Sequence, residues 1–214
     1  MRVTKIEGQK KHPSRKSVFL DGSFAFGVCD DVLLKYSLRE GAELEQGAVE
    51  NILEAEHEEA AKQKTLRFLS IRPRSKKEIR DYLLRKEYST EIADRVVARL
   101  ESLKLLDDEA FARMVCRDML ARKPVGEKLL RQSLFKKGVP KVLIDTIAAE
   151  FFTAESDLLM AVKAAERQLE RVERTSKRLD DIHVKKKILD YLVRRGFDFD
   201  TAMNATKKLL SKAS

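Results

Sequence analysis

The amino-acid sequence predicts a mainly α-helical protein in which three tandem three-helix units follow a small N-terminal β-hairpin arm. Three observations support this prediction. The first stretch of about 45 residues is rich in Val, Ile and Phe, which favour strands. From Lys62 onward Ala, Leu, Glu, Lys and Arg dominate, and these are strong helix formers. An apolar and basic pattern recurs three times in this helical region, so we expect an elongated, curved array of neighbouring repeats.

The N-terminal arm is predicted from two segments, VTKIEGQ and SVFLDGSFAFGVC. The second segment contains Asp21-Gly22, and a type I′ hairpin turn needs positive φ at both central residues, which Asp and Gly tolerate. A hairpin of this size is not stable alone, so we expect it to pack against the helices that follow. An acidic stretch, residues 40–61, holds eight glutamates and no Lys or Arg, and it precedes the basic helical region.

The repeat is visible when the sequence is aligned with itself. EIRDYLLRKEYSTEIADRVVARL (78–100) matches KLLRQSLFKKGVPKVLIDTIAAEF (128–151) after a shift of 51 residues, and a further shift of 58 reaches KKILDYLVRRGFDFDTAMNATKKL (186–209). Apolar residues coincide at spacings of three, four and seven, which mark buried helix faces. The coinciding sets are Ile79, Leu130 and Ile188; Leu83, Leu134 and Leu192; Tyr88, Val139 and Phe197; Val96, Ile147 and Ala205; and Leu100, Phe151 and Leu209.

Each unit is therefore predicted to hold a leading helix followed by a helix–turn–helix. The leading helix ends near Ser70 in the first unit and covers roughly 108–122 and 155–178 in the other two. Ser75 and Glu78 form a capping box at the start of the first unit's middle helix, since each satisfies an exposed N–H of the other. The predicted segments are the arm, 1–45, and three units, 46–106, 107–153 and 154–214.

Two acidic pairs, Asp107-Asp108 and Asp180-Asp181, stand directly before predicted amphipathic helices. An Asp at this place accepts hydrogen bonds from free N–H groups, and further acids suit the positive end of the helix dipole. A catalytic dyad would need both carboxylates aimed at one bond, and a metal site would need more converging ligands. We therefore interpret both pairs as helix caps. Pro140 is likewise placed at the first position of a helix.

The chemistry-bearing residue types form no catalytic or metal-binding pattern. His12, His57 and His183 lack partners at zinc-ligand spacing. Cys29 and Cys116 lie far apart and suit buried thiols in a reducing compartment better than a disulfide framework. The sequence has neither a glycine-rich phosphate loop nor a nucleophile elbow. We predict a protein that is not an enzyme and takes no metal and no cofactor.

Composition points to an anionic partner inside the cell. Lys and Arg number 44 against 35 Asp and Glu, which gives a net charge of +9 and a pI of about 9.5. The longest stretch without a charge or His, GSFAFGVC (22–29), is far too short to span a membrane. The N-terminus lacks the apolar core of a signal peptide. We expect a cytoplasmic protein.

Basic residues gather in three clusters, one in each unit, and their recurrence predicts a stripe of positive potential that binds a polyanion or an acidic groove. The alternative is that they are solvated helix faces. The last helix of each unit carries mixed charges, which disfavours base-specific reading, and few exposed aromatics disfavour a stacking platform. The candidate residues are Arg72, Arg74, Lys76, Lys77 and Arg80; Arg117, Arg122, Lys123, Lys128, Arg131, Lys136 and Lys137; and Lys185, Lys186, Lys187, Arg194 and Arg195.

Two stretches, RPRSKKEIRDYLLRKEY (72–88) and LLDDEAFARMVCRDMLARKPVGEKLLRQSLFKKGV (105–139), resemble the bacterial RecX family. The order and spacing of several short motifs carry this resemblance, and the arm and the third unit also resemble family members. Glu87 departs from the pattern, because a glycine is usual there. The matching positions are Arg74, Ser75 and Glu78; Leu106, Asp107, Asp108, Phe111 and Ala112; and Arg122, Gly126, Lys137 and Gly138.

The resemblance implies a cytoplasmic, non-enzymatic modulator of the RecA recombinase. Such a protein binds RecA, above all its filament on single-stranded DNA, and mostly inhibits the ATPase, strand-exchange and coprotease activities of RecA in DNA repair, recombination and the SOS response. It acts as a monomer, with double-stranded DNA as a second candidate ligand. Two alternatives stay open: a DNA-binding repeat protein without a RecA partner, and an adaptor whose helices dock proteins while its charges only confer solubility.

Overall fold

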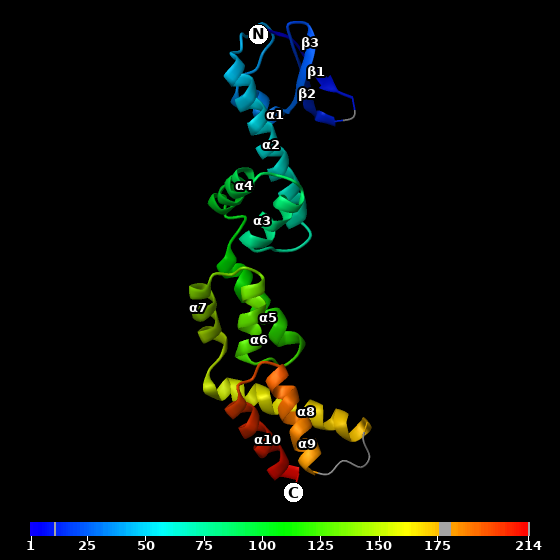
Figure 1. The fold of residues 1–214 in the computed structure, drawn as a ribbon, viewed down its shortest axis with the longest axis vertical. Helices are drawn as coiled ribbons and strands as arrows, with labels where there is room; N and C mark the ends of the chain where they lie inside the picture. Colours follow the sequence, from blue (N-terminus) through cyan, green and yellow to red (C-terminus); the bar gives the residue numbers. More distant parts are fainter. Residues whose placement is uncertain (11, 176–180, 214) are drawn as a thin grey trace. The chain divides into compact units, whose positions relative to one another are not determined.

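The computed structural model describes residues 1–10, 12–175 and 181–213 and confirms the predicted fold class, with ten helices and one small sheet in that part of the chain (Figure 1). The chain divides into two compact units, Met1–Arg74 with Ile79–Leu106, and Ser75–Glu78 with Asp107–Ser214. The elements in order are β1 Val3–Gln9, β2 His12–Leu20, β3 Ser23–Cys29, α1 Asp30–Lys35, α2 Gln46–Leu69, α3 Lys76–Arg85, α4 Thr90–Ser102, α5 Asp108–Arg122, α6 Glu127–Lys136, α7 Lys141–Phe151, α8 Ala154–Thr175, α9 Asp181–Arg194 and α10 Phe199–Ala213.

The N-terminal arm is a three-stranded antiparallel sheet in the order β1-β2-β3, so the predicted hairpin gains a third strand. The turn between β2 and β3 is the predicted one: Asp21 and Gly22 have φ of 48° and 86°, and both signs match a type I′ turn. The β1 segment is strand-like in sequence, but local pattern does not predict its partner, because its pairing with β2 depends on contacts between residues distant in sequence.

The sheet packs against the helices that follow it, as predicted. Its inner face supplies Val18, Phe26 and Val28, which form one buried cluster with Val32 of α1 and Ile52 of α2. A buried polar contact reinforces this packing, because the Glu56 carboxylate accepts a hydrogen bond from the Cys29 backbone N–H at 2.7 Å and lies 2.6 Å from the Arg15 guanidinium. The small sheet thereby gains the apolar cover that it cannot provide for itself.

Helix α2 is 24 residues long and serves two cores in succession. Its first half contributes Ile52 to the core under the sheet, and its second half contributes Ala61 to the core of the first repeat. Figure 1 shows α2 running from the sheet to α3 and α4. The acidic stretch of the sequence lies mainly on this helix, which ends at Leu69, one residue before the predicted Ser70.

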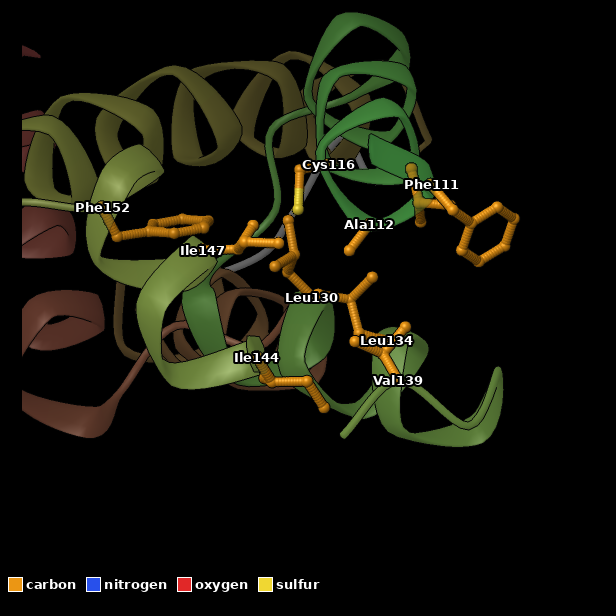
Figure 2. Close-up of a cluster of buried hydrophobic side chains, with 10 residues drawn as sticks. Phe111, Ala112, Cys116, Leu130, Leu134, Val139, Ile144, Ile147 and Phe152 are labelled. Atoms are coloured by element: carbon orange, nitrogen blue, oxygen red, sulfur yellow. The ribbon is translucent and has the colours of Figure 1, made fainter. Parts of the chain in front are cut away.

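The three repeats bury the residues that the internal alignment singled out. Of the fifteen aligned apolar positions, all are buried except Tyr88 and Phe151, which are half-buried. Figure 2 shows the second repeat, where Leu130, Leu134 and Ile147 meet beneath Cys116 of α5. In this repeat Phe152 joins the buried cluster one residue beyond the aligned position.

The helix starts follow the predicted capping chemistry, with one correction. In the capping box the Glu78 backbone N–H donates to Ser75 Oγ at 3.1 Å, and the Ser75 N–H donates to Glu78 Oε2 at 3.3 Å. Asp107 caps α5, since its Oδ1 accepts from two N–H groups at 2.8 and 3.0 Å. Pro140 precedes α7 as the N-cap instead of being its first residue, because its ψ of 142° is extended. The predicted Asp180 cap and the Asp181 side chain lie outside the described residues.

Candidate interaction surface

Two of the candidate basic residues, Arg80 and Arg131, form ion pairs at equivalent positions of the first and second repeats. The Arg80 guanidinium lies 2.6 Å from Asp94, and Arg131 pairs with Asp145, the residues that the 51-residue shift places in register. Hydrogen bonding to Asp94 raises the pKa of Arg80. In each case a middle helix is tied to the last helix of its repeat. Each arginine is partly exposed and lies against a carboxylate of its own repeat, and its place on a binding surface stays a prediction.

Arg131 is held on two sides. Besides Asp145, it lies 2.5 Å from Glu127, one turn earlier on α6. In the third repeat the further 58-residue shift brings Leu189 and Met203 to the places of the arginine and the aspartate. The recurrent ion pair is therefore replaced there by two apolar, half-buried side chains.

Two further candidate cations lie over aromatic rings. The Arg74 guanidinium lies 3.8 Å from the centre of the Phe68 ring, and that ring stacks on Tyr82 with centroids 4.1 Å apart. Lys137 Nζ lies 5.7 Å from the centre of the Phe111 ring. Contacts of this kind stabilise the fold through cation–π attraction. Arg74 and Lys137 thus have structural contacts beside any role in binding.

Another candidate, Arg195, joins α9 to the loop before α6. Its guanidinium donates two hydrogen bonds to the Pro124 carbonyl, at 2.7 and 3.1 Å. The Gly126 N–H donates to the Arg195 carbonyl at 3.0 Å, and the Lys128 N–H donates to the Gly196 carbonyl at 3.1 Å. Two N–H groups at the start of α6 are thereby satisfied by the two residues that follow α9.

Glycine is required at this junction. A Cβ atom on Gly126 would lie 2.3 Å from the backbone of Gly196. Gly196 itself has φ of +88°, and a Cβ there would lie 2.4 Å from Leu129. The Gly126 motif position therefore reflects close backbone packing between the second and third repeats.

A second junction lies inside the same compact unit, which includes Ser75–Glu78. Ser75 Oγ donates to the Lys137 carbonyl at 2.5 Å, and the Lys76 N–H donates to Asp108 Oδ1 at 2.9 Å. Asp108 is buried, and its carboxylate caps α3 in addition to complementing the dipole of α5. The capping of α3 was not predicted from the sequence. Gly138, with φ of +78°, packs against the Lys77 side chain.

This second junction gives the glycine position a physical reason. The position that corresponds to Gly138 in the first repeat is Glu87, which has φ of 64° and an exposed side chain. The left-handed turn is thus kept in the first repeat, while the close packing that excludes a Cβ is found at Gly138 and Gly196. The departure from the family pattern falls where the side chain faces solvent.

All but one of the remaining candidates are exposed. Across residues 1–10, 12–175 and 181–213 the structure gives nine of them no ion pair and no cation–π contact. Arg72 is also exposed and donates to the Pro73 carbonyl, while Lys76 is half-buried and Lys77 exposed; all three have interactions within the chain. The nine are Arg117, Arg122, Lys123, Lys128 and Lys136 in the second repeat, and Lys185, Lys186, Lys187 and Arg194 in the third.

The two thiols are poorly suited to nucleophilic chemistry. Burial raises the pKa of Cys116 to about 11, and burial also raises the pKa of Cys29. Both therefore stay protonated near neutral pH, whereas a reactive cysteine needs its thiolate form. In the described part of the chain no three His, Cys, Asp or Glu side chains are grouped as metal ligands. Among the same residues no helix is long and apolar enough to cross a membrane.

Comparison with known proteins matches four family models to successive parts of the chain: the regulatory protein RecX N-terminal domain to residues 1–45, and the first, second and third three-helix domains of RecX to 61–100, 107–146 and 161–206. The first matched range covers the sheet and α1, and each of the other three covers part of one repeat.

Relatives match over nearly the whole chain. The regulatory protein RecX of Bacillus licheniformis is 32% identical over 206 residues, 96% of this chain and 76% of the relative, and that of Listeria monocytogenes is 28% identical over 212 residues, 99% and 77%. A crystal structure of regulatory protein RecX has a TM-score of 0.81 at 27% identity and covers 96% of this chain and 98% of that one. The structure of RecX from Lactobacillus salivarius, 22% identical with a TM-score of 0.63, covers 72% of this chain and 97% of its own and supports the fold. The chain therefore belongs to the RecX family of regulatory proteins.

Proposed function

We propose that this protein is a non-enzymatic regulator that binds the RecA recombinase and its filament on single-stranded DNA, and that it mostly inhibits the ATPase, strand-exchange and coprotease activities of RecA. The observation that carries the proposal is membership of a family of regulatory proteins along nearly the whole chain. The protein acts in the cytoplasm, as a monomer and without a cofactor, in DNA repair and recombination and in the SOS response.

The charge distribution supports a polyanionic or acidic partner. The cations that hold the repeats together, such as Arg80 and Arg131, are paired with carboxylates. Lys123 and Lys128, which flank the loop between α5 and α6, are exposed. We propose that Lys123, Lys128 and the other seven of the nine exposed candidates named above form the binding surface, because the attraction of these residues to phosphate or carboxylate is not offset by an ion pair among the described residues.

The proposal is tested by titrating the protein into RecA on single-stranded DNA and following ATP hydrolysis. We expect hydrolysis to fall, and we expect Lys123→Glu/Lys128→Glu to weaken the inhibition while the melting temperature stays nearly unchanged. Lys141→Glu is the matched control, since Lys141 is exposed at the start of α7 and does not belong to the proposed surface. Unchanged hydrolysis at a molar excess of the unmodified protein would rule out the proposed function.

A further inference from the structure

The third repeat carries a positively charged groove between α8 and α9. The groove has a volume of about 370 Å³ and is lined by Gln168 and Arg171 of α8 and by Lys187, Asp190, Tyr191 and Arg194 of α9. Residues three, four and seven apart share one face of a helix, so the α9 residues point into the groove as a single row. The basic clusters of the sequence indicated Lys187 and Arg194, but not Arg171, which joins them through tertiary packing.

Two cations of this groove, Lys187 and Arg194, differ from Arg80 and Arg131 of the first two repeats, which are paired with carboxylates. Besides Arg171, which has interactions within the chain, the groove holds two basic side chains, Lys187 and Arg194, and one carboxylate, Asp190. In the described residues neither Lys187 nor Arg194 has an ion pair, and both side chains are exposed. By contrast, Arg131 of the second repeat is held by two carboxylates. Lys187 and Arg194 together outweigh the single charge of Asp190, so positive charge remains available to a ligand.

We infer that this groove binds the phosphodiester backbone of single-stranded DNA; the inference deepens the proposed function by assigning the DNA contact to the third repeat. Lys187 and Arg194 lie seven residues apart on α9, about 10 Å along the helix axis. That length suits a row of phosphates more than a single anion. Guanidinium groups bind phosphate oxygens through paired N–H donors.

The uncharged groups of the groove also fit a nucleotide strand. The Gln168 amide offers N–H donors to a phosphate or a base edge, and the half-buried Tyr191 offers an aromatic ring beside the cations. Stacking of bases on aromatic rings contributes to single-strand binding without sequence preference. Tyr191 also packs against the buried cluster of the third repeat, and the polyglutamate competition described below distinguishes an acidic peptide from DNA.

The experiment measures binding of a fluorescent oligothymidylate by anisotropy across a salt series, without RecA. The test variant is Lys187→Ala/Arg194→Ala, and the matched control is Lys207→Ala/Lys208→Ala, which removes two exposed cations of α10 outside the groove. We expect the groove variant to bind about tenfold more weakly, with a salt slope lower by about 1.4 because two phosphate contacts are lost, and the control to stay near the unmodified protein. Circular dichroism melting checks folding, and Lys187→Gln/Arg194→Gln replaces a variant that melts early.

Three outcomes would overturn the inference: no oligonucleotide binding by the unmodified protein at low salt, an equal loss in the groove and control variants, or displacement of the oligonucleotide by polyglutamate as readily as by unlabelled oligothymidylate. RecA-dependent ATP hydrolysis, measured on the same proteins, separates this result from the proposed function. Inhibition of RecA with groove-independent DNA binding removes only the groove. Groove-dependent DNA binding without any effect on RecA removes only the regulatory proposal.

Discussion

At the scale of single residues, Asp157 is a buried carboxylate without full compensation. It lies in the first turns of α8 with 8% of its surface exposed, and its Oδ1 has no hydrogen-bond partner among the described residues. Burial raises its pKa to about 6, and the nearby charges of Asp198 and Glu127 act in the same direction. The side chain of Asp157 therefore binds a proton more tightly in the folded protein than in the unfolded chain.

We predict that Asp157→Asn stabilises the protein at neutral pH. The pKa of Asp157 is higher in the folded chain than the value of about 4 in the unfolded chain, so its contribution to stability is present below pH 4 and is lost as the pH rises to about 6. The asparagine resembles the protonated acid and avoids this loss, which amounts to at most about 3 kcal/mol. Urea denaturation at pH 4.5 and pH 7.5 measures the gain, which should be larger at pH 7.5. An equal difference at both values would contradict the assignment.

Gly126 provides a second residue-scale prediction. A methyl group there would meet the backbone of Gly196 at 2.3 Å, and backbone atoms cannot rotate away. We expect Gly126→Ala to lower the free energy of unfolding by about 1–3 kcal/mol or more, as overpacked sites do. The control is Gly47→Ala in α2, where nothing lies within 4 Å of the added carbon and the change should be neutral or slightly stabilising. Equal effects of the two changes in urea denaturation would show that the junction is loose.

At the scale of helices, each repeat depends on the apolar face of its middle helix. Leu134 of α6 is fully buried, while its neighbour Phe135 is 72% exposed. We predict that Leu134→Ala costs about 2–5 kcal/mol of folding free energy, whereas Phe135→Ala changes it by about 0.5 kcal/mol or less. Thermal or urea denaturation measures both. A large loss for Phe135→Ala would indicate that α6 is turned by a fraction of a helical turn from its position here.

The same scale shows what sequence alone could predict. Burial of Leu134 and its equivalents followed from local periodicity, since every helical turn repeats the signal. The capping of the Lys76 N–H by Asp108 could not be predicted in this way, because 32 residues separate the two groups and no local pattern links them. The Arg131–Asp145 pair could have been predicted from the sequence. The internal alignment places Arg80 and Asp94 in register with it, so both charges recur together.

At the scale of the whole molecule, we propose that the chain forms an elongated, curved array. Its parts are an arm, 1–45, and three units, 46–106, 107–153 and 154–214. The repeats predict such an array because each unit is expected to contact chiefly its neighbours. Small-angle X-ray scattering tests the prediction. A compact protein of 214 residues has a radius of gyration of about 17 Å, and we expect a clearly larger value. A value near 17 Å would contradict the array.

The length of α2 limits where the N-terminal half of the chain can be cut, and which of its parts can be exchanged with a relative. Because Ile52 and Ala61 of this one continuous helix belong to two adjoining cores, a cut before Ile52 or after Ala61 separates one core from a helix residue that fills it. The sheet and the first repeat should consequently melt in one cooperative step. A chimaera that takes only the sheet or only the first repeat from a relative should therefore be less stable than one that takes both.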